Sequence, residues 1–277
     1  MDGAVTAVTV RVDDRLRLVG WLLAAGDWPT WEQARKPYRP HRVAEGTRRS
    51  LAAHRQHPAV LWAQTLAASS EAGLSALFAH ALAGDWPDEA AGLMADFAAA
   101  QPQAAWVEPG PDWQAAADSL QAVLAGAGLG EFLEDIFGGL PGTLVVFPNL
   151  LYPGHEAVAV CAAGELVLSQ PPPPAWGSST PWHYDARRDE VLASLAEGFA
   201  RGLLALRPDL GPLSLTALPV AVAVLFLRQA EGEAAADQFM LVEQRMRRLP
   251  KLAAIVAALQ GRRGLPALGA ALNDIAA

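Results

Sequence analysis

Most of this chain consists of segments rich in Ala and Leu, which favour helix, and the block from Gly138 to Leu168 has instead the Val-rich pattern of β-strands. A second short stretch of this kind lies near the start of the chain. The predicted strands are Ala4–Val12, Thr143–Phe147, Ala157–Ala162 and Glu165–Leu168, with a turn at Ala163 and Gly164 between the last two. With few strands among many helices, the sequence predicts an α+β fold that is predominantly helical.

Prolines and capping residues divide the helical remainder into separate helices. Asp13 or Asp14 can cap the first helix, which ends at Gly26. Further helices are expected at residues 42–56, 58–82, 87–100, 111–127, 131–137 and 189–206, and after Pro212 with breaks at Pro250 and at residues 264–266. Because no clear linker separates them, residues 1–277 are expected to form a single compact unit with subregions 1–137, 138–206 and 207–277.

The charges of the chain are unevenly distributed. No Lys or Arg occurs between Gln56 and Ala186, a stretch that holds 14 Asp and Glu, so the flanks carry all 21 basic residues. This asymmetry can mark a site for a charged partner, or it can let acidic and basic segments face each other in the fold. The net charge of −8 and the lack of a matching motif argue against a nucleic-acid partner.

Three features bear on the compartment. Cys161 is the single cysteine, which excludes an internal disulfide and suits a reducing environment. The N-terminus carries an early acid and no basic region followed by an apolar run, so we read no signal peptide. The longest apolar stretch, Leu215–Leu227, is too short to span a bilayer and contains Pro219. We therefore expect a cytoplasmic protein without a membrane partner, and the sequence does not indicate its oligomeric state.

The histidines do not form a complete metal motif. No two of them are four residues apart, the spacing that places two imidazoles on one face of a helix. His155 and Glu156 begin like a zinc motif, but Ala159 stands where the second histidine would be. Cys161 has apolar neighbours in a predicted strand and is expected to pack in the core. Since no phosphate loop or dinucleotide motif occurs either, no cofactor is expected.

The segment Asp189–Leu206 is predicted to form an amphipathic helix. Its apolar stripe consists of Val191, Leu192, Leu195, Phe199, Leu203 and Leu206. Glu197 lies off this stripe, and Arg201 follows four residues later. This is the spacing of a surface ion pair, which stabilises a helix by a few tenths of a kcal/mol.

The order of these features resembles a known family. A strand and helix in VTVRVDDRLRLVGWLL precede a loop with Tyr38 and a helix that contains HPAV, His57–Val60. A Gly-x-Pro segment then leads into LVVFPNLLYPG, a β-hairpin, a Pro-rich connector and the amphipathic helix. Over residues 4–260 this order resembles a bacterial family of uncharacterised gluzincin-like zinc metallopeptidases. The resemblance implies a thermolysin-like core, in which a small antiparallel sheet lies next to the active-site helix.

In that family the active-site helix carries His-Glu-x-x-His, whose two histidines bind zinc while the Glu acts as general base. The best placement puts Glu197 at the general-base position and Ala196 and Ala200 at the two histidine positions. A methyl group has no lone pair to donate, so the resemblance implies a degenerate site without its metal. The third ligand, a Glu on the following helix, would be Glu231 or Glu233.

The resemblance therefore implies a pseudoenzyme, a metallopeptidase-like protein that binds a peptide or protein without cleaving it. The groove would lie beside Val145, Val146, Phe147 and Asn149, where a peptidase holds an extended peptide by strand addition. Two alternatives stay open. One is an active metal-dependent hydrolase with atypical ligands, such as His155, His183 and a carboxylate, and the other is a helical protein-interaction module unrelated to peptidases.

Overall fold

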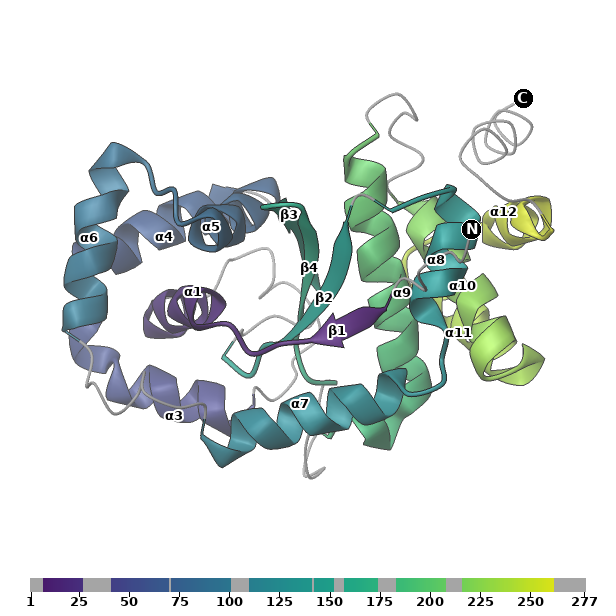
Figure 1. Cartoon of the computed structure of the whole chain (residues 1–277), viewed down its shortest axis with the longest axis horizontal. Coiled ribbons are helices and arrows are strands. Elements are labelled where there is room, and N and C mark those ends of the chain that lie inside the picture. Colours follow the sequence, from purple (N-terminus) through teal and green to yellow (C-terminus); the bar gives the residue numbers. More distant parts are fainter. Residues whose placement is uncertain are drawn as a thin grey trace.

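The fold is α+β and mostly helical, with one small sheet between two groups of helices (Figure 1). The computed structural model describes residues 7–26, 41–69, 71–100, 110–140, 142–151, 157–173, 183–207 and 216–261. Within this part of the chain, buried apolar side chains from Leu16 to Leu259 form one hydrophobic core cluster. Helices on both sides of the sheet therefore share a continuous core.

The sheet is mixed, not antiparallel as the resemblance implied. It contains β1 (Val8–Val10), β2 (Thr143–Pro148), β3 (Val158–Ala162) and β4 (Glu165–Gln170), in the order β1-β2-β4-β3. β1, β2 and β4 are parallel, and β3 alone is antiparallel to its neighbour β4. The expectation was wrong because the local pattern reveals only the β3–β4 hairpin. The pairing of Val8 with Leu144 joins residues that are far apart in the sequence, so tertiary packing determines it.

The hairpin turn lies where the sequence predicts it. Ala163 and Gly164 both have positive φ angles, of 51° and 78°, as a two-residue type I′ turn requires. The turn pairs Ala162 with Glu165 and continues to the pair Val158 and Ser169. This register fixes which backbone groups of β3 point away from β4.

One group of helices lies on one side of the sheet, and within this group α5 contacts β3 (Figure 1). Asp13 caps the first of these helices and Gly26 ends it, as predicted. The expected helix at 58–82 is in fact two helices, and the one at 42–56 ends early and is followed by a short 3-10 turn. The group consists of α1 (Asp14–Ala25), α3 (Arg42–Ser50), the 3-10 turn η1 (Ala52–His54), α4 (Pro58–Ser69), α5 (Glu71–Ala83) and α6 (Asp88–Ala99).

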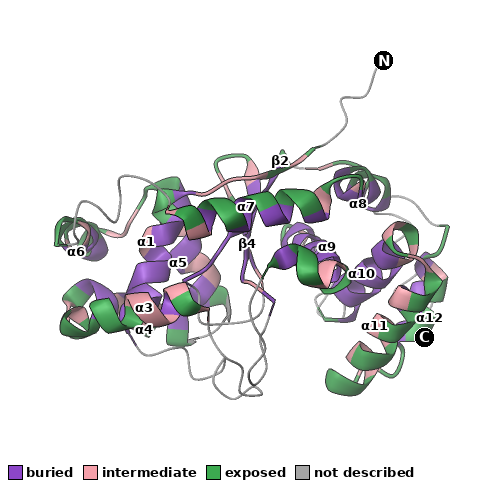
Figure 2. Ribbon diagram, turned by 90° about the horizontal axis from the view of Figure 1, so that it is seen from below, coloured by how far each residue is buried: buried purple, intermediate pink, exposed green. Residues whose placement is uncertain are grey.

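The second group of helices lies on the other side of the sheet (Figure 1). It consists of α8 (Leu129–Phe137), α9 (Arg188–Ala205), α10 (Ala217–Ala230), α11 (Glu233–Met246) and α12 (Leu252–Leu259), with the 3-10 turn η3 (Tyr184–Arg187) before α9. Every residue of α10 from Ala217 to Leu227 is buried, and α10 lies between α9 and the pair α11 and α12 (Figure 2). α7 (Pro111–Leu124) runs past the end of the sheet and contacts β1 and β2.

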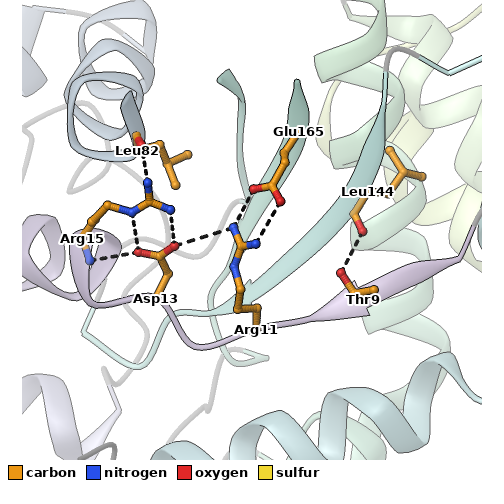
Figure 3. A network of polar contacts seen from close by, with 7 residues as sticks. All are labelled: Thr9, Arg11, Asp13, Arg15, Leu82, Leu144 and Glu165. Atoms are coloured by element: carbon orange, nitrogen blue, oxygen red, sulfur yellow. Dashed lines mark hydrogen bonds and ion pairs between the residues drawn. The ribbon is translucent and has the colours of Figure 1, made fainter. Parts of the chain in front are cut away.

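A network of ion pairs fixes the start of the chain to the sheet (Figure 3). Both guanidinium NH2 groups of Arg11 donate to Glu165 at the beginning of β4, with N–O distances of 2.9 and 2.6 Å. Asp13 accepts hydrogen bonds from the backbone and guanidinium of Arg15, which also donates to the carbonyl of Leu82 in α5. The segment between β1 and α1 is thus tied to β4 and to α5.

Within the described residues, no helix combines the length and the apolar character needed to cross a membrane.

Candidate functional site

The candidate site is built on α9, the helix that the resemblance equates with an active-site helix. Gly198 and Gly202 face the sheet and let α9 approach it closely. A Cβ atom on Gly198 would lie 2.6 Å from Cδ1 of Leu168, and one on Gly202 would lie 2.8 Å from Cδ1 of Leu166. Both distances are shorter than van der Waals contact, so the glycines set how near α9 lies to β4.

Ala196 and Ala200 lie one turn apart, on the side of α9 away from these glycines. Both are completely buried, with 0% exposure. α10 packs closely against α9, and the ion pair of Arg188 with Glu231 joins the start of α9 to the end of α10, so the two helices run antiparallel. The residues of α10 level with Ala196 and Ala200 lie around Val222, where every side chain is apolar and buried. α10 therefore offers no polar side chain at the level of Ala196 and Ala200.

Glu197 is buried between these alanines, with 6% exposure, and is held by two arginines. Arg201 donates to Oε1, and Arg247, the residue after α11, donates to Oε1 and to Oε2, the latter at 3.0 Å. Arg247 also pairs with Glu243 of α11. The ion pair with Arg201 expected from the spacing is present, but it lies at a buried helix contact and not on an open surface.

The contacts of Glu197 determine what it can do chemically. Both carboxylate oxygens accept hydrogen bonds from guanidinium groups, which is the arrangement of a structural ion pair. A general base needs an oxygen in contact with the water or group that it deprotonates. Arg247 could not be predicted as a partner of Glu197, because it lies 50 residues away in the sequence.

The carboxylates expected as a third zinc ligand are not near Ala196 and Ala200. Glu231 follows α10 and accepts a hydrogen bond of 2.8 Å from Nε of Arg188. Glu233 begins α11 and pairs with Arg228 at 2.6 Å. Arg188 precedes Ala196 by eight residues, about 12 Å along the helix, so Glu231 is bound near the start of α9 and not at the alanines.

Two histidines of the described chain, His41 and His57, accept hydrogen bonds at helix starts. His41 accepts the backbone N–H of Val43 at the start of α3, and burial lowers its pKa to about 4. His57 accepts the N–H of Ala59 in the same way at the start of α4. His183 is exposed before η3, and His155 lies outside the described residues. Among the residues that the structure describes, no group of three His, Cys, Asp or Glu side chains could hold a metal ion.

The groove expected along β2 is not formed at Val145 and Val146. β2 pairs with β1 on one side and with β4 on the other, so this part of the strand has no free edge for a peptide. The side chains of Val145, Val146, Phe147 and Asn149 are all buried, with at most 1% exposure. The expectation was wrong because a strand pattern does not show whether the strand is central or at an edge.

Asn149 has a structural role at the end of β2. Its amide nitrogen donates to Oγ of Ser169 at 2.9 Å, and its amide oxygen accepts the N–H of Leu151 at 3.2 Å. Nearby, the hydroxyl of Tyr184 donates to the carbonyl of Gln170, and burial raises the pKa of Tyr184 well above its usual range. These buried polar groups satisfy one another and attach η3 to the ends of β2 and β4.

The edge strand of the sheet next to α9 is β3. Its inner edge pairs with β4, and in the strand order of the described residues no strand lies beyond it. In a hairpin with a two-residue turn, Ala162, Val160 and Val158 bond to β4, so the N–H and C=O groups of Ala159 and Cys161 point outward. The sequence predicted that Cys161 packs in the core, but Cys161 is exposed. Gly202 of α9 lies against Ala159, and α9 ends three residues later at Ala205, so the helix does not cover Cys161.

Two surface hollows of the structure lie away from α9. The larger, of about 400 Å³, lies between α1 and α6 and is lined by Asp14, Arg15, Leu18, Ala98 and Ala99. The smaller, of about 160 Å³, lies at β1 and the start of α8. Neither is lined by a residue of α9, so neither adds to the candidate site.

Comparisons with known proteins add no further likeness. A scan against protein-family models, a search of curated proteins and a search of solved structures each gave no match.

Proposed function

We propose that this chain is a catalytically inactive, gluzincin-like protein that binds an extended peptide or protein segment without cleaving it. The observation that carries the proposal is the surroundings of Glu197. Where the resemblance would put two zinc ligands and a general base, α9 has two buried methyl groups and a carboxylate bound by Arg201 and Arg247. Such an arrangement stabilises the packing of α9 and leaves no ligand set for zinc at Ala196 and Ala200.

The peptide would bind along the outer edge of β3. This edge offers the backbone N–H and C=O groups of Ala159 and Cys161, and a peptide that adds a strand obtains its affinity from such groups. β3 packs against α9 through Ala157 and Ala159, which lie near Gly198 and Gly202. The β3 edge thus replaces the groove that the sequence suggested along β2.

The test combines peptide selection with an assay for cleavage. A phage-displayed library of random short peptides is selected against the whole protein, and the enriched peptides are then incubated with the protein and zinc and analysed by mass spectrometry. The proposal predicts that peptides are enriched and remain intact. Cleavage of these peptides would contradict the inactive state, and failure to enrich any peptide would contradict the binding function.

A proline substitution locates the binding edge. Cys161→Pro removes an outward N–H without removing a hydrogen bond to β4, because edge strands tolerate proline at such positions. Cys161→Ser is the matched control, since it changes the side chain and keeps the N–H. Peptide affinity should fall at least about tenfold in the proline variant and be retained in the serine variant. Equal affinities in the two variants would place the peptide elsewhere.

A further inference from the structure

An exposed apolar patch lies on α11, away from the candidate site. Leu241, Val242 and Met246 are 51%, 48% and 57% exposed. α11 itself lies at the periphery of the molecule, and much of its length is exposed (Figure 2). Three large apolar side chains together on one helix face are unusual for a surface that only contacts water.

The charges along this face are arranged in a definite order. Asp237, Leu241 and Arg245 are spaced four residues apart, so they form one row along the helix. All three are exposed, and Asp237 remains 56% exposed although it lies 3.6 Å from Arg228. The row therefore reads acidic, apolar, basic, with Leu241 midway between the two charges.

The charges of this row are complementary to those of the same row running in the opposite direction. In two antiparallel helices related by a two-fold axis at Leu241, residues equally far before and after Leu241 face each other. Asp237 of one copy then faces Arg245 of the other, and the same pair forms again on the other side of the axis. Val242 and Met246 flank the contact and extend its apolar centre.

We propose that α11 is a homodimer interface in which this face packs against the same face of a second copy of the chain. A patch one helix long is small for a stable interface, so the dimer forms with a Kd in the micromolar range, at about 1–100 µM. The contact uses only residues of α11, so it does not include the β3 edge proposed to bind a peptide.

The first experiment measures association of the whole protein by sedimentation velocity over about 1–300 µM, the range that brackets this Kd. The wild type should shift from monomer to dimer. Leu241→Glu places two carboxylates at the axis and should raise Kd at least about 100-fold. The matched control is Leu61→Glu on α4, where Leu61 is 42% exposed, and it should dimerise like the wild type. A wild type that stays monomeric over the whole range would overturn the proposal.

Exchanging the charges tests the identity of the partner. Arg245→Glu alone and Asp237→Lys alone each place like charges opposite one another in their own dimers and should each weaken dimerisation about tenfold. Mixing the two variants places Asp237 opposite Arg245 at one end, and the introduced lysine opposite the introduced glutamate at the other. The mixture should therefore dimerise as tightly as the wild type. A mixture that associates no better than its components would overturn the two-fold arrangement.

Discussion

Two ion-pair networks among the described residues, one at Glu197 and one at Glu165, differ in burial. Glu197 is 6% exposed and is bound by Arg201 of α9 and by Arg247 at the end of α11. Glu165 is 29% exposed and receives Arg11 at the rim of the sheet, beside Asp13 and Arg15. In water-rich surroundings such pairs contribute little, whereas a buried charge that loses its partner is costly. We therefore expect the ion pairs of Glu197 to contribute more to the free energy of unfolding than the ion pair of Glu165.

This difference also bears on function. Catalytic carboxylates usually cost stability, and their removal leaves the fold as stable or more stable. A carboxylate that neutralises two arginines next to a core has the opposite effect when it is removed. The stability of variants therefore separates a structural Glu197 from a catalytic one.

The largest effect is expected for Glu197→Gln, which keeps the shape of the side chain and removes its charge. Arg201 and Arg247 would lose the carboxylate that they share beside a buried helix contact, while Arg247 would keep its pair with Glu243. The free energy of unfolding should fall by about 2–3 kcal/mol, below the full cost of an isolated buried charge because both arginines are partly exposed. Urea denaturation measures this loss. A variant as stable as the wild type would contradict the structural role of Glu197 and favour a catalytic role.

A smaller loss is expected for Asp13→Ala at the start of α1. Asp13 caps the helix by accepting the N–H of Arg15 at 2.9 Å and also pairs with the guanidinium of Arg15. Its removal should lower the free energy of unfolding by about 1–2 kcal/mol. Asp13→Asn keeps the cap and removes the charge, so it should lose less than half as much. If both variants lose the same amount, the charge and not the cap stabilises this end of α1.

Glu165→Gln should lower the free energy of unfolding still less, by about 0.5–1 kcal/mol, because both side chains of its pair with Arg11 are partly exposed. The pH dependence sharpens this prediction. The hydrogen bond from Arg11 lowers the pKa of Glu165. For Asp13, burial alone would raise the pKa, but the hydrogen bonds and the charge of Arg15 outweigh burial, so the pKa of Asp13 is lowered as well. Carboxyls with a lowered folded-state pKa stabilise the fold above their unfolded values, and this contribution is lost as the pH falls below about 4 toward the lower folded-state values.

The wild type should therefore lose stability faster than Glu165→Gln as the pH falls through this range, and the difference between them should shrink. Denaturation at several pH values between about 3 and 7 checks this. A difference that stays constant with pH would mean that the ionised Glu165 contributes nothing through Arg11.

The smallest effect is expected for Glu190→Ala, which serves as the exposed reference for Glu197 on the same helix. Glu190 is 46% exposed and pairs with Arg187 three residues earlier. Its loss should change the free energy of unfolding by less than about 0.5 kcal/mol. A loss as large as that of Glu197→Gln would remove the distinction between buried and exposed pairs.

The sequence predicted what depends on near neighbours. The cap at Asp13 or Asp14, the end of α1 at Gly26 and the turn at Ala163 and Gly164 follow from local geometry, and the structure shows the cap at Asp13 and confirms the other two. The ion pair between Glu197 and Arg201 also follows from helical spacing.

What the sequence did not predict depends on contacts between distant segments. The parallel pairing of β1 with β2 and the contact of Arg247 with Glu197 join residues far apart in the chain. These pairings between distant segments also decide which strand lies at the edge of the sheet. Without them, the sequence predicts a groove along β2, which is a central strand, and a buried Cys161, which is exposed. Local patterns contain no information on these choices.

The central claim is that α9 carries a structural ion pair where the resemblance would place a zinc centre. The most direct test is the metal content of untagged protein, purified without chelator, incubated with zinc, desalted and analysed by mass spectrometry. The account predicts that no stoichiometric zinc is retained and that Glu197→Gln does not alter this result. One tightly bound zinc per chain would contradict the account and favour an active hydrolase with ligands other than those expected on α9.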